Sequence, residues 1–579
     1  MMTSAKTVQS SWLKPLGFHH SVVISNRCIS PRWASSKCVE LKKVGILGGG
    51  LAGLTTAYYL ARRSPSRPME IIVLEKANRF GGWIKSHKPD SHDGRPESTV
   101  QGCIFESGPR SVRPKGLAGM MTLDLIKELG LFDSLIVIPK SHPSAKNRYI
   151  FTPSGLQKLP SSIFTLLSTL HKSPINRIPK AVIKDLFQKP DERVIEDESI
   201  QEFIERRFGS KMGEEIVSAM VHGIYAGDYR QLSARSTLFG PIWELERKHG
   251  GVLKGLMVGR KSAPSIEGKQ SRLLANSLPS DLTNASVWGL QGGLETVTNA
   301  LLSWLEQQPN VYLKSRETII SIQSSFDGLL NVTTANQTFD KFDHLVSALP
   351  PQVLHSTLPL SVQQQLEMLT VNPMVTVGVV NLAYHSRQRL IPIPPAFGYL
   401  IPASIGRDLN PHGVLGVVFD SDMMPGLDQE NGDQITKLTV MLGGHHYSRA
   451  NYPLPSAESL VQQAAEIVKS QFKISERPIY AKAHIQKDCI PQYLVGHHQR
   501  MTQLHVLLQS QRISVVGSGY GGVGVNDVVR SSREAAEKLL QTGNSTGLES
   551  HHRSRKPTPW CGFVSLMQQI CSLGKDFFG

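Results

Sequence analysis

Three consecutive glycines follow a short apolar segment in "KVGILGGGLAGLTTAYYLARR" at residues 43–63. The segment before them predicts a buried parallel strand, and the apolar spacing after them predicts a helix. Gly48, Gly50 and Gly53 match the pattern G-x-G-x-x-G. In that pattern the first glycine permits a tight turn, the second lets the backbone approach a pyrophosphate, and the third lets the helix pack closely on the strand. Because the helix N-terminus also presents N–H groups to phosphates, the sequence predicts a dinucleotide-binding unit.

A second predicted strand, "MEIIVLEK" at residues 69–76, supports this interpretation. Its acid Glu75 follows Gly53 by about 20 residues, where a carboxylate accepts a hydrogen bond from a ribose hydroxyl. An acid at this position disfavours a ribose 2′-phosphate, since that group would need an arginine. The next segment, "RFGGWIKS" at residues 79–86, is similar to the stretch that extends the cofactor site in two-dinucleotide-domain flavoproteins. This similarity favours FAD over NAD.

The C-terminal part contains another predicted strand, glycine-rich turn and helix, in "RISVVGSGYGGVGVNDVVRSSREAAEKLL" at residues 512–540. Such a repeat suits a chain that returns to the same cofactor, with the N-terminus of this helix at the isoalloxazine end. The alternative is a second, independent nucleotide site.

We therefore predict an α/β fold: a Rossmann-like FAD fold of the two-dinucleotide-binding-domain type, with a mixed-sheet substrate lobe and a helical membrane-binding lobe. A chain of 579 residues is too long for one hydrophobic core, so its segments are expected to alternate between these parts. The predicted segments are the FAD-binding residues 43–148, 287–350 and 481–544, the helical lobe or lid at 149–251, a flexible insertion at 252–286, the substrate lobe at 351–480 and an amphipathic tail at 545–579.

The formal net charge of +16 is partly concentrated at the N-terminus. Residues 1–43 contain seven Lys and Arg residues and one acid, Glu40, and they are rich in serine without a continuous apolar core. This composition predicts a mitochondrial transit peptide over residues 1–42, with a disordered basic tail as the alternative. The positive charge of the remaining chain favours an anionic membrane surface or an acidic substrate. No nucleic-acid partner is predicted.

Two segments could attach the protein to a membrane surface. Residues 151–190 are predicted to be helical and combine basic residues with an apolar cluster between Ile163 and Leu170. The tail after residue 544 also has apolar residues at helical spacing. Amphipathic helices of this kind lie in a membrane interface, although each could instead pack on the body of the protein. No run of eighteen uncharged apolar residues occurs, so a membrane-spanning helix is not predicted.

The cysteines and histidines do not predict a metal site. The six cysteines form no C-x-x-C pair, which argues against a zinc site and against a redox dithiol. We also do not predict metal binding by the tandem pairs His445–His446 and His497–His498. His222 is interpreted as structural, with a proton-shuttle role as the alternative. The sequence offers neither a Ser-His-Asp set nor a carboxylate pair, so no catalytic side chain is predicted.

Five further segments resemble one family of flavin oxidases, the protoporphyrinogen oxidases of the mitochondrial type, over roughly residues 43–542. Amine oxidases and phytoene desaturases share the fold and the two terminal glycine motifs. They do not share the Gly-Pro-Arg-Ser and Ile-Pro-Gln-Tyr-x-x-Gly-His stretches. The five segments are "IFESGPRSVRP" (104–114), "AKNRYIF" (145–151), "VHGIYAGDYRQLSARS" (221–236), "GGLETVTNAL" (292–301) and "IPQYLVGHHQR" (490–500).

The resemblance implies that FAD binds without a covalent bond, and no cysteine stands in residues 512–530 to form one. The implied cofactor residues are Gly48, Gly49, Gly50, Leu51, Ala52 and Gly53 at the pyrophosphate, Glu75 at the ribose, Trp83 after the Gly-Gly pair, Gly108, Pro109, Arg110 and Ser111 along the flavin, Ile319 on the adenine side, and Ser518, Val523, Gly524 and Val525 over the flavin.

The resemblance also implies an activity, the six-electron oxidation of protoporphyrinogen IX to protoporphyrin IX in haem biosynthesis, with molecular oxygen as the acceptor and hydrogen peroxide as the by-product. Because the cofactor carries this chemistry, the protein mainly positions the substrate and excludes water. The implied location is the intermembrane-space side of the mitochondrial inner membrane, as a peripheral protein. A homodimer and a contact with ferrochelatase are implied as well.

Arg148 and Gly223 are the implied substrate contacts. In an apolar cleft the guanidinium of Arg148 would hold a propionate by two parallel bonds, and Gly223 would let the backbone approach the macrocycle. The alternative for Arg148 is an ordinary surface arginine. For the whole chain, the alternatives are another FAD-dependent amine oxidase-type enzyme and a flavin-less escort protein of the same fold that binds prenylated GTPases.

Overall fold

The structure is a computed structural model, and it describes residues 41–62, 69–89, 100, 102–161, 174–189, 195–259, 266–385, 389–428, 435–448 and 453–552. Nearly all of the predicted transit peptide, the apolar cluster at 163–170 and most of the C-terminal tail lie outside these residues. Within them, no helix combines the length and the apolar character that crossing a membrane requires.

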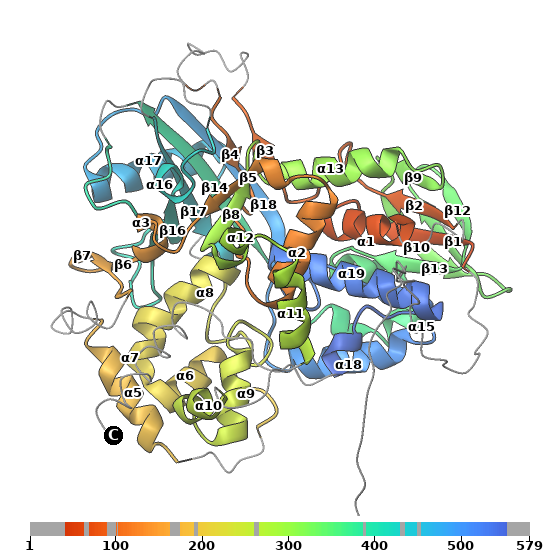
Figure 1. The fold of residues 1–579 in the computed structure, drawn as a ribbon, viewed down its shortest axis with the longest axis horizontal. Coiled ribbons are helices and arrows are strands. Elements are labelled where there is room, and N and C mark those ends of the chain that lie inside the picture. Colours follow the sequence, from red (N-terminus) through yellow and green to blue (C-terminus); the bar gives the residue numbers. More distant parts are fainter. Residues whose placement is uncertain are drawn as a thin grey trace, which may run out of the picture. The chain divides into compact units, whose positions relative to one another are not determined.

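A parallel five-stranded sheet carries the two glycine-rich turns (Figure 1). Its order is β19-β13-β1-β2-β9, and every neighbouring pair is parallel. Parallel sheets are buried on both faces, which explains the continuous apolar runs of the strands. The strands are β1 (Lys43–Leu47), β2 (Glu70–Leu74), β9 (Val311–Lys314), β13 (His344–Ser347) and β19 (Ile513–Val515). Strands from all three predicted FAD-binding segments therefore meet in one sheet.

The helices that follow the two glycine turns are neighbours, although they come from opposite ends of the chain. Helix α1 (Leu51–Arg62) packs against α19 (Val525–Thr542) and against α13 (Glu295–Glu306), and all three lie beside the parallel sheet in Figure 1. Tyr58 of α1 meets Trp304 of α13 edge to face, with ring centroids 4.7 Å apart. This arrangement brings both helix N-termini to the same edge of the sheet, because both follow parallel strands.

A seven-stranded sheet forms the second part of the fold, in the order β18-β14-β17-β16-β15-β6-β7. All of its pairs are antiparallel except β15 with β6, which confirms the predicted mixed sheet. Helix α17 (Ala457–Phe472) packs on β14 and β18. The strands are β6 (Tyr149–Thr152), β7 (Gly155–Lys158), β14 (Met374–His385), β15 (Gly398–Leu400), β16 (Val414–Phe419), β17 (Ile435–Gly443) and β18 (Tyr480–Pro491).

Three smaller sheets and several short helices complete the connections. The small sheets are β10-β11-β12, β3-β4 and β5-β8, all of them antiparallel. Their strands are β3 (Ser86–His87), β4 (Phe105–Glu106), β5 (Leu135–Ile138), β8 (Val287–Leu290), β10 (Ile319–Ser324), β11 (Leu330–Thr334) and β12 (Thr338–Phe342). The connecting helices include α2 (Gly116–Glu128), α3 (Pro143–Lys146), α14 (Pro351–Thr357), α15 (Leu360–Gln363), α16 (Asp420–Met423) and α18 (His497–Leu508).

The helical lobe has its own hydrophobic core and a buried ion pair. The guanidinium of Arg207 lies 2.7 Å from the carboxylate of Asp185, and neither side chain is exposed to solvent. The Asp185 carboxylate also accepts N–H bonds from Val252 and Leu253, which satisfies its remaining lone pairs. This pair joins the first two helices of the lobe. Its helices are α5 (Arg177–Phe187), α6 (Ile200–Phe208), α7 (Ser210–Met212), α8 (Ser218–Tyr225), α9 (Gly240–His249) and α10 (Val252–Gly259).

The observed boundaries of the seven-stranded sheet differ from the predicted ones on both sides. β6 and β7 belong to this sheet, although residues 149–158 were predicted to begin the helical lobe. β18 also belongs to it, although most of this strand was predicted in the last FAD-binding segment. In both cases the partner strand is distant in sequence, so no local pattern shows the pairing.

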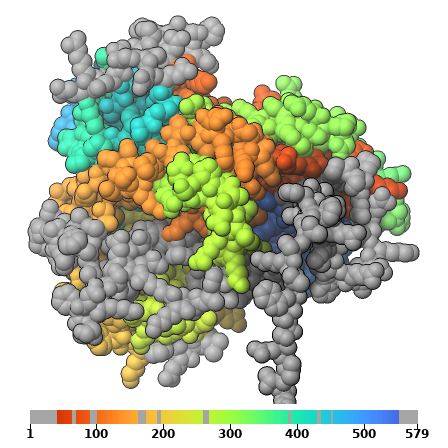
Figure 2. Space-filling model, viewed as in Figure 1, coloured from red at the N-terminus to blue at the C-terminus, as the bar shows by residue number. Residues whose placement is uncertain are grey.

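The predicted flexible insertion at 252–286 is helical where it is described. α10 is followed by α11 (Ile266–Asn276) and α12 (Ser280–Asn284), and α11 packs on α2. Figure 2 shows this lime-green stretch as a ridge on the surface, next to the orange residues that include α2. Leu278 and Leu282 are buried in the core of the nucleotide-binding part. The many polar residues of the segment therefore mark a solvent-facing side of short helices.

Candidate active site

The glycines of the first turn, between β1 and α1, are required for different reasons. Gly48 has φ of +98°, in the region that favours glycine. A Cβ at Gly53 would lie 1.9 Å from the carbonyl oxygen of Gly48, so the helix could not approach the strand with any side chain there. A Cβ at Gly50 would meet no atom of the protein closer than the Cα of Gly82, at 3.6 Å. The packing of the protein therefore explains Gly53 but does not explain Gly50, which fits a position kept bare for a ligand.

Glu75 follows β2 directly, and its carboxylate points at the first turn. Its Oε2 accepts the N–H of Gly49 at 2.7 Å, and its Oε1 accepts the N–H of Ala77 at 2.8 Å. Each carboxylate oxygen keeps a second lone pair for a ligand hydroxyl. The carbonyl oxygen of Glu75 also accepts the N–H of Glu317 at 2.8 Å, which places the segment leading to Ile319 beside this acid. The structure thus brings the predicted ribose and adenine residues together.

The Gly81–Gly82–Trp83 segment packs against the first turn. The N–H of Gly81 donates to the carbonyl oxygen of Gly49 at 2.9 Å. Trp83 keeps an exposed side chain, while its carbonyl oxygen would lie 2.3 Å from a Cβ at Gly108. Gly108 is therefore needed because two segments of the chain approach closely at that point.

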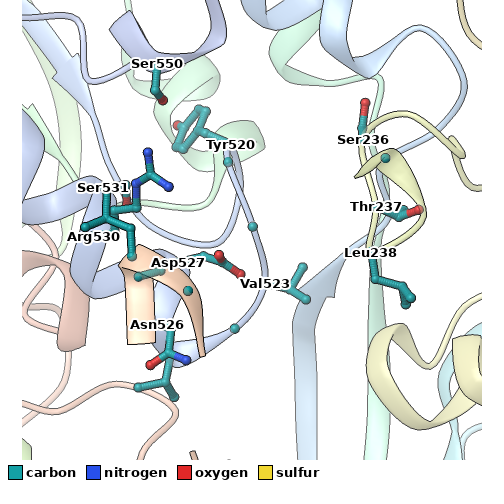
Figure 3. A pocket seen from close by; sticks show the side chains of 18 of the residues that line it. Ser236, Thr237, Leu238, Tyr520, Val523, Asn526, Asp527, Arg530, Ser531 and Ser550 are labelled. Atoms are coloured by element: carbon teal, nitrogen blue, oxygen red, sulfur yellow. The ribbon is translucent and has the colours of Figure 1, made fainter. Parts of the chain in front are cut away.

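A cavity of about 390 Å³ opens beside the second glycine turn. Figure 3 shows Tyr520, Val523 and the start of α19 on one side, and Ser236, Thr237 and Leu238 on the other, with the Val523 side chain directed across the opening. Of the predicted cofactor residues, Pro109, Ser111, Val523, Gly524 and Val525 line this cavity. The predicted residues outside its lining are Gly48–Gly53, Glu75, Trp83, Gly108, Arg110, Arg148, Gly223, Ile319 and Ser518.

Side chains from the 490–500 motif hold the second turn. The sequence predicted the family resemblance of this motif but not this structural role. The Tyr493 hydroxyl donates to the carbonyl oxygen of Ser518 and accepts the N–H of Gly522 at 2.9 Å. His497 Nε2 lies 2.8 Å from the carbonyl oxygen of Tyr520, so this nitrogen carries the hydrogen. His497 Nδ1 then accepts an amide N–H of Asn372 at 2.8 Å. The motif therefore supports the turn from behind.

Glu106 is a further site residue that the sequence did not predict. Its Oε1 accepts the N–H of Leu294 at 2.7 Å, and its Oε2 accepts the hydroxyl of Ser86 at 2.9 Å. A Cβ at Gly293 would lie 2.2 Å from the Ser86 hydroxyl oxygen and 2.7 Å from Oε1, which explains the second glycine of the Gly-Gly pair before α13. Burial raises the pKa of the Glu106 carboxyl to about 7, against the opposing effect of these hydrogen bonds. Glu106 thus joins two of the motifs, 104–114 and 292–301.

The comparisons with known proteins agree with this geometry. Residues 51–540 match the family of flavin containing amine oxidoreductases. The chain is 34% identical to protoporphyrinogen oxidase of Schizosaccharomyces pombe over 518 residues, which are 87% of this chain and 99% of that protein. The chain belongs to the protoporphyrinogen oxidase family. It is also 32% identical to the human protein of that name over 507 residues, with 86% and 99% covered.

A solved structure shows the fold of this family. The crystal structure of an Exiguobacterium protein assigned as a protoporphyrinogen oxidase superposes with a TM-score of 0.65 at 21% identity. It covers 86% of this chain and 99% of that chain. Nearly the full length of that protein is therefore matched by the fold of this chain.

The site fits the flavin dinucleotide of the protoporphyrinogen oxidase family. The bare backbone at Gly50 would face the pyrophosphate, since a Cβ there makes only an ordinary contact with the protein, at 3.6 Å from the Cα of Gly82. The remaining lone pairs of Glu75 would accept a ribose hydroxyl. The second turn borders a cavity and begins α19, whose first-turn N–H groups have no partners within the helix. The chain is therefore an FAD-dependent oxidoreductase.

Arg110, predicted to run along the flavin, has its side chain in an ion pair. Its Nη1 donates to Asp420 at 2.8 Å, and the other carboxylate oxygen of Asp420 accepts the hydroxyl of Thr439 at 2.6 Å. Asp420 begins α16 and Thr439 lies in β17. The Arg110 side chain therefore joins the nucleotide-binding part to the seven-stranded sheet, which leaves its backbone for a cofactor contact.

Arg148 and Gly223, the predicted substrate contacts, both lie next to β15. Arg148 directly precedes β6, whose Ile150 pairs with Leu400, and its guanidinium carbon lies 5.4 Å from the ring centre of Phe397. Gly223 lies in α8, and a Cβ there would come within 2.7 Å of the Leu400 side chain. The structure thus places the two predicted residues next to the same short strand.

Proposed function

We propose that this chain oxidises protoporphyrinogen IX to protoporphyrin IX in haem biosynthesis, with non-covalent FAD as the cofactor and molecular oxygen as the acceptor. The observation that carries the proposal is the end-to-end similarity to eukaryotic protoporphyrinogen oxidases. The intact cofactor features, Glu75 and the second glycine turn, argue against a flavin-less escort protein of the same fold.

The chemistry divides between cofactor and protein. Bound FAD would accept electron pairs from the macrocycle and pass them to oxygen. The whole reaction removes six electrons and six hydrogens, so three oxygen molecules become three hydrogen peroxide molecules. The protein holds the cofactor through its two glycine turns, orients the macrocycle and excludes water. Arg148 would fix the ring by holding one propionate.

The direct test mixes FAD-loaded protein with protoporphyrinogen IX in air and follows porphyrin fluorescence and peroxide. The expected result is about three peroxide molecules for each porphyrin formed, as an oxygen-dependent flavin oxidase requires. Peroxide formed with amines but not with the porphyrinogen would instead identify an amine oxidase. A folded protein that retains no flavin would support the escort reading.

The carboxylate anchor is tested with matched arginine variants. Arg148→Ala should lower kcat/KM for protoporphyrinogen IX by a factor that corresponds to a loss of about 2–4 kcal/mol in transition-state stabilisation. Arg148→Lys should recover only part of this loss, because a point charge cannot form two parallel hydrogen bonds to the carboxylate. The flavin content should stay normal. A porphyrinogen ester without the carboxylates should be insensitive to both changes. Equal losses for acid and ester would make Arg148 a structural residue.

We also propose that the helical lobe contacts an anionic membrane. α5 buries Ile178, Ala181, Val182 and Asp185 on one face. Its other face exposes Ile183, Leu186 and Phe187, which share one side of the helix at spacings of three and four residues. Phe187 is 83% exposed, and the exposed Lys180 lies one turn before Ile183. An exposed apolar stripe beside a basic residue is the pattern of a helix in a membrane interface.

Vesicle flotation tests the membrane contact. The wild-type protein should float with vesicles that contain anionic lipid at low salt, and Phe187→Ser with Ile183→Ser should reduce this fraction several-fold. Leu273→Ser is the matched control, because Leu273 of α11 is 71% exposed but lies outside the helical lobe. An equal fraction for all three proteins would contradict the contact through α5.

The remaining proposals concern location and partners. The composition of residues 1–43 supports import into mitochondria, and the family resemblance supports a peripheral position on the intermembrane-space side of the inner membrane. A fluorescent fusion that stays outside mitochondria would contradict this location. A homodimer and a ferrochelatase contact are proposed on the resemblance alone, and analytical ultracentrifugation with and without ferrochelatase would test both.

A further inference from the structure

Three histidines from distant parts of the chain meet beside α8. His222 lies within that helix, and the pair His445–His446 follows β17. Their ligand nitrogens all lie within 4.8 Å of one another, and no other set of three or more His, Cys, Asp or Glu side chains in the described ranges comes as close. We propose that this cluster binds a divalent transition-metal ion of the Zn²⁺ type, independently of the flavin and of the porphyrinogen reaction.

The orientation of His222 is the first argument. Its Nδ1 lies 2.6 Å from the carbonyl oxygen of Ile401, and a carbonyl only accepts, so Nδ1 carries the hydrogen. In the neutral imidazole the lone pair is then at Nε2, the atom that faces His445 at 3.0 Å. Metal-binding histidines commonly donate their second ring N–H to a carbonyl in this way, which fixes both tautomer and ring orientation.

The backbone that carries the other two histidines is held rigidly. Gly443 and Gly444 have φ of +91° and +59°, and a Cβ at Gly444 would lie 2.2 Å from the carbonyl oxygen of Ala226. The N–H of His445 donates to that same carbonyl oxygen at 2.8 Å. Ala226 is the residue directly after α8, the helix of His222. The ligands are therefore pre-organised, so an ion pays little ordering cost.

The spacing and the ligand type point to the class of ion. Two nitrogens bound at about 2.0–2.1 Å to a tetrahedral ion are about 3.3–3.4 Å apart, close to the observed separation of the His222 and His445 Nε2 atoms. Imidazole-only sites suit Zn²⁺, Cu²⁺ or Ni²⁺, whereas Ca²⁺ and Mg²⁺ prefer oxygen ligands. His445 and His446 are half-buried as residues, and both ring nitrogens of His446 are shielded from solvent. Three protein ligands leave a fourth position for water.

The competing explanation is an N–H···N hydrogen bond between His222 and His445 with no ion. It accounts for the short distance between those two rings. It does not explain why a third histidine, His446, lies at the same place, with its ring centroid 4.1 Å from that of His445 and 5.7 Å from that of His222. Sequence reasoning could not find this cluster, because His222 and His445 are 223 residues apart.

The test uses the full-length FAD-loaded protein, purified without a polyhistidine tag and treated with a chelator. Equilibrium dialysis against buffered Zn²⁺ should show one ion per chain. His445→Ala and His446→Ala should each weaken this binding by at least about tenfold, since even indirect support of a metal ligand is worth that much. His498→Ala is the matched control: it removes a half-buried histidine of the other tandem pair and should leave binding unchanged.

A spectroscopic measurement on the wild-type protein tests the site without depending on whether a variant folds. Wild-type protein loaded with Cu²⁺ should show electron paramagnetic resonance couplings to imidazole nitrogens. Flavin content serves as the folding check for every variant. The proposal is overturned if the wild type binds no stoichiometric Zn²⁺, if the Cu²⁺ spectrum lacks nitrogen couplings, or if His498→Ala weakens binding as much as His445→Ala does.

Discussion

The two glycine-rich turns of this protein are held in place by hydrogen bonds from different parts of the chain. The first turn, at Gly48–Gly53, is held by residues less than 35 positions away: Glu75, directly after β2, accepts the N–H of Gly49, and the N–H of Gly81 donates to the carbonyl oxygen of Gly49. The second turn, at 517–524, depends on Tyr493 and His497, which come from a separate segment. The first turn and its supporting residues can therefore be predicted from local sequence. For the second turn the glycine pattern can be predicted, but its supporting residues cannot, because they are distant along the chain.

The largest effects are expected from substitutions in the first turn, where Gly53 and Gly50 should respond differently. Gly53→Ala should destabilise the fold by about 3 kcal/mol or more, because its Cβ meets backbone that cannot move aside. Gly50→Val should leave an apoprotein that folds but retains no FAD, since its side chain takes the place of the pyrophosphate. Thermal unfolding and flavin content distinguish the two. Normal flavin in folded Gly50→Val would refute the cofactor assignment.

The stability of the folded protein should also depend on pH through Glu106 of β4, by an amount similar to the effect of Gly53→Ala. Its pKa is raised from 4.5 to about 7 in the folded protein, so the stability linked to this carboxyl is present below pH 4.5 and is lost as the pH rises to about 7. The loss should be on the order of 3 kcal/mol. Glu106→Gln should remove this dependence; its amide oxygen can still accept the Leu294 N–H, while its amide nitrogen would donate to the Ser86 hydroxyl instead of accepting from it. Identical Tm profiles between pH 4.5 and 7.5 would count against the raised pKa.

Glu75→Ala should weaken FAD binding by about 1.5–3 kcal/mol, the size of a hydrogen bond to a charged group. The variant also loses the contact to the Gly49 N–H, so Glu75→Gln is the informative control. The glutamine keeps an acceptor for that N–H and lacks the charge. An FAD dissociation constant that is the same in all three proteins would move the ribose contact elsewhere.

The smallest expected effect belongs to the second turn. Tyr493→Phe removes the hydroxyl that links Ser518 and Gly522, and it should weaken FAD binding by about 1–2 kcal/mol. Tyr384→Phe is the control, since Tyr384 is an equally buried tyrosine in β14 and has no hydrogen bond to the second turn among those described. If both variants lower Tm alike and neither changes the FAD dissociation constant, the second turn needs no outside support.

These differences show what local sequence can and cannot predict. The β1 turn and Glu75 were predicted because each depends on neighbours within about 30 residues, the length of a βαβ unit. The helix α19 was predicted to follow the second glycine-rich turn and to end near Leu540. The pairing of β6 with β15 and the contact of Glu106 with Leu294 were not predicted, since both join segments far apart in the chain. Such partners are chosen by tertiary packing, which leaves no periodic mark in the sequence.

The most direct test of the central claim is anaerobic mixing of FAD-loaded protein with protoporphyrinogen IX. The proposed function predicts that the visible flavin absorbance bleaches within seconds while porphyrin absorbance appears, and that admitting oxygen restores the flavin spectrum. Benzylamine or putrescine under the same conditions should leave the flavin oxidised. A flavin that stays oxidised with the porphyrinogen, yet bleaches with an amine, would contradict the proposed function.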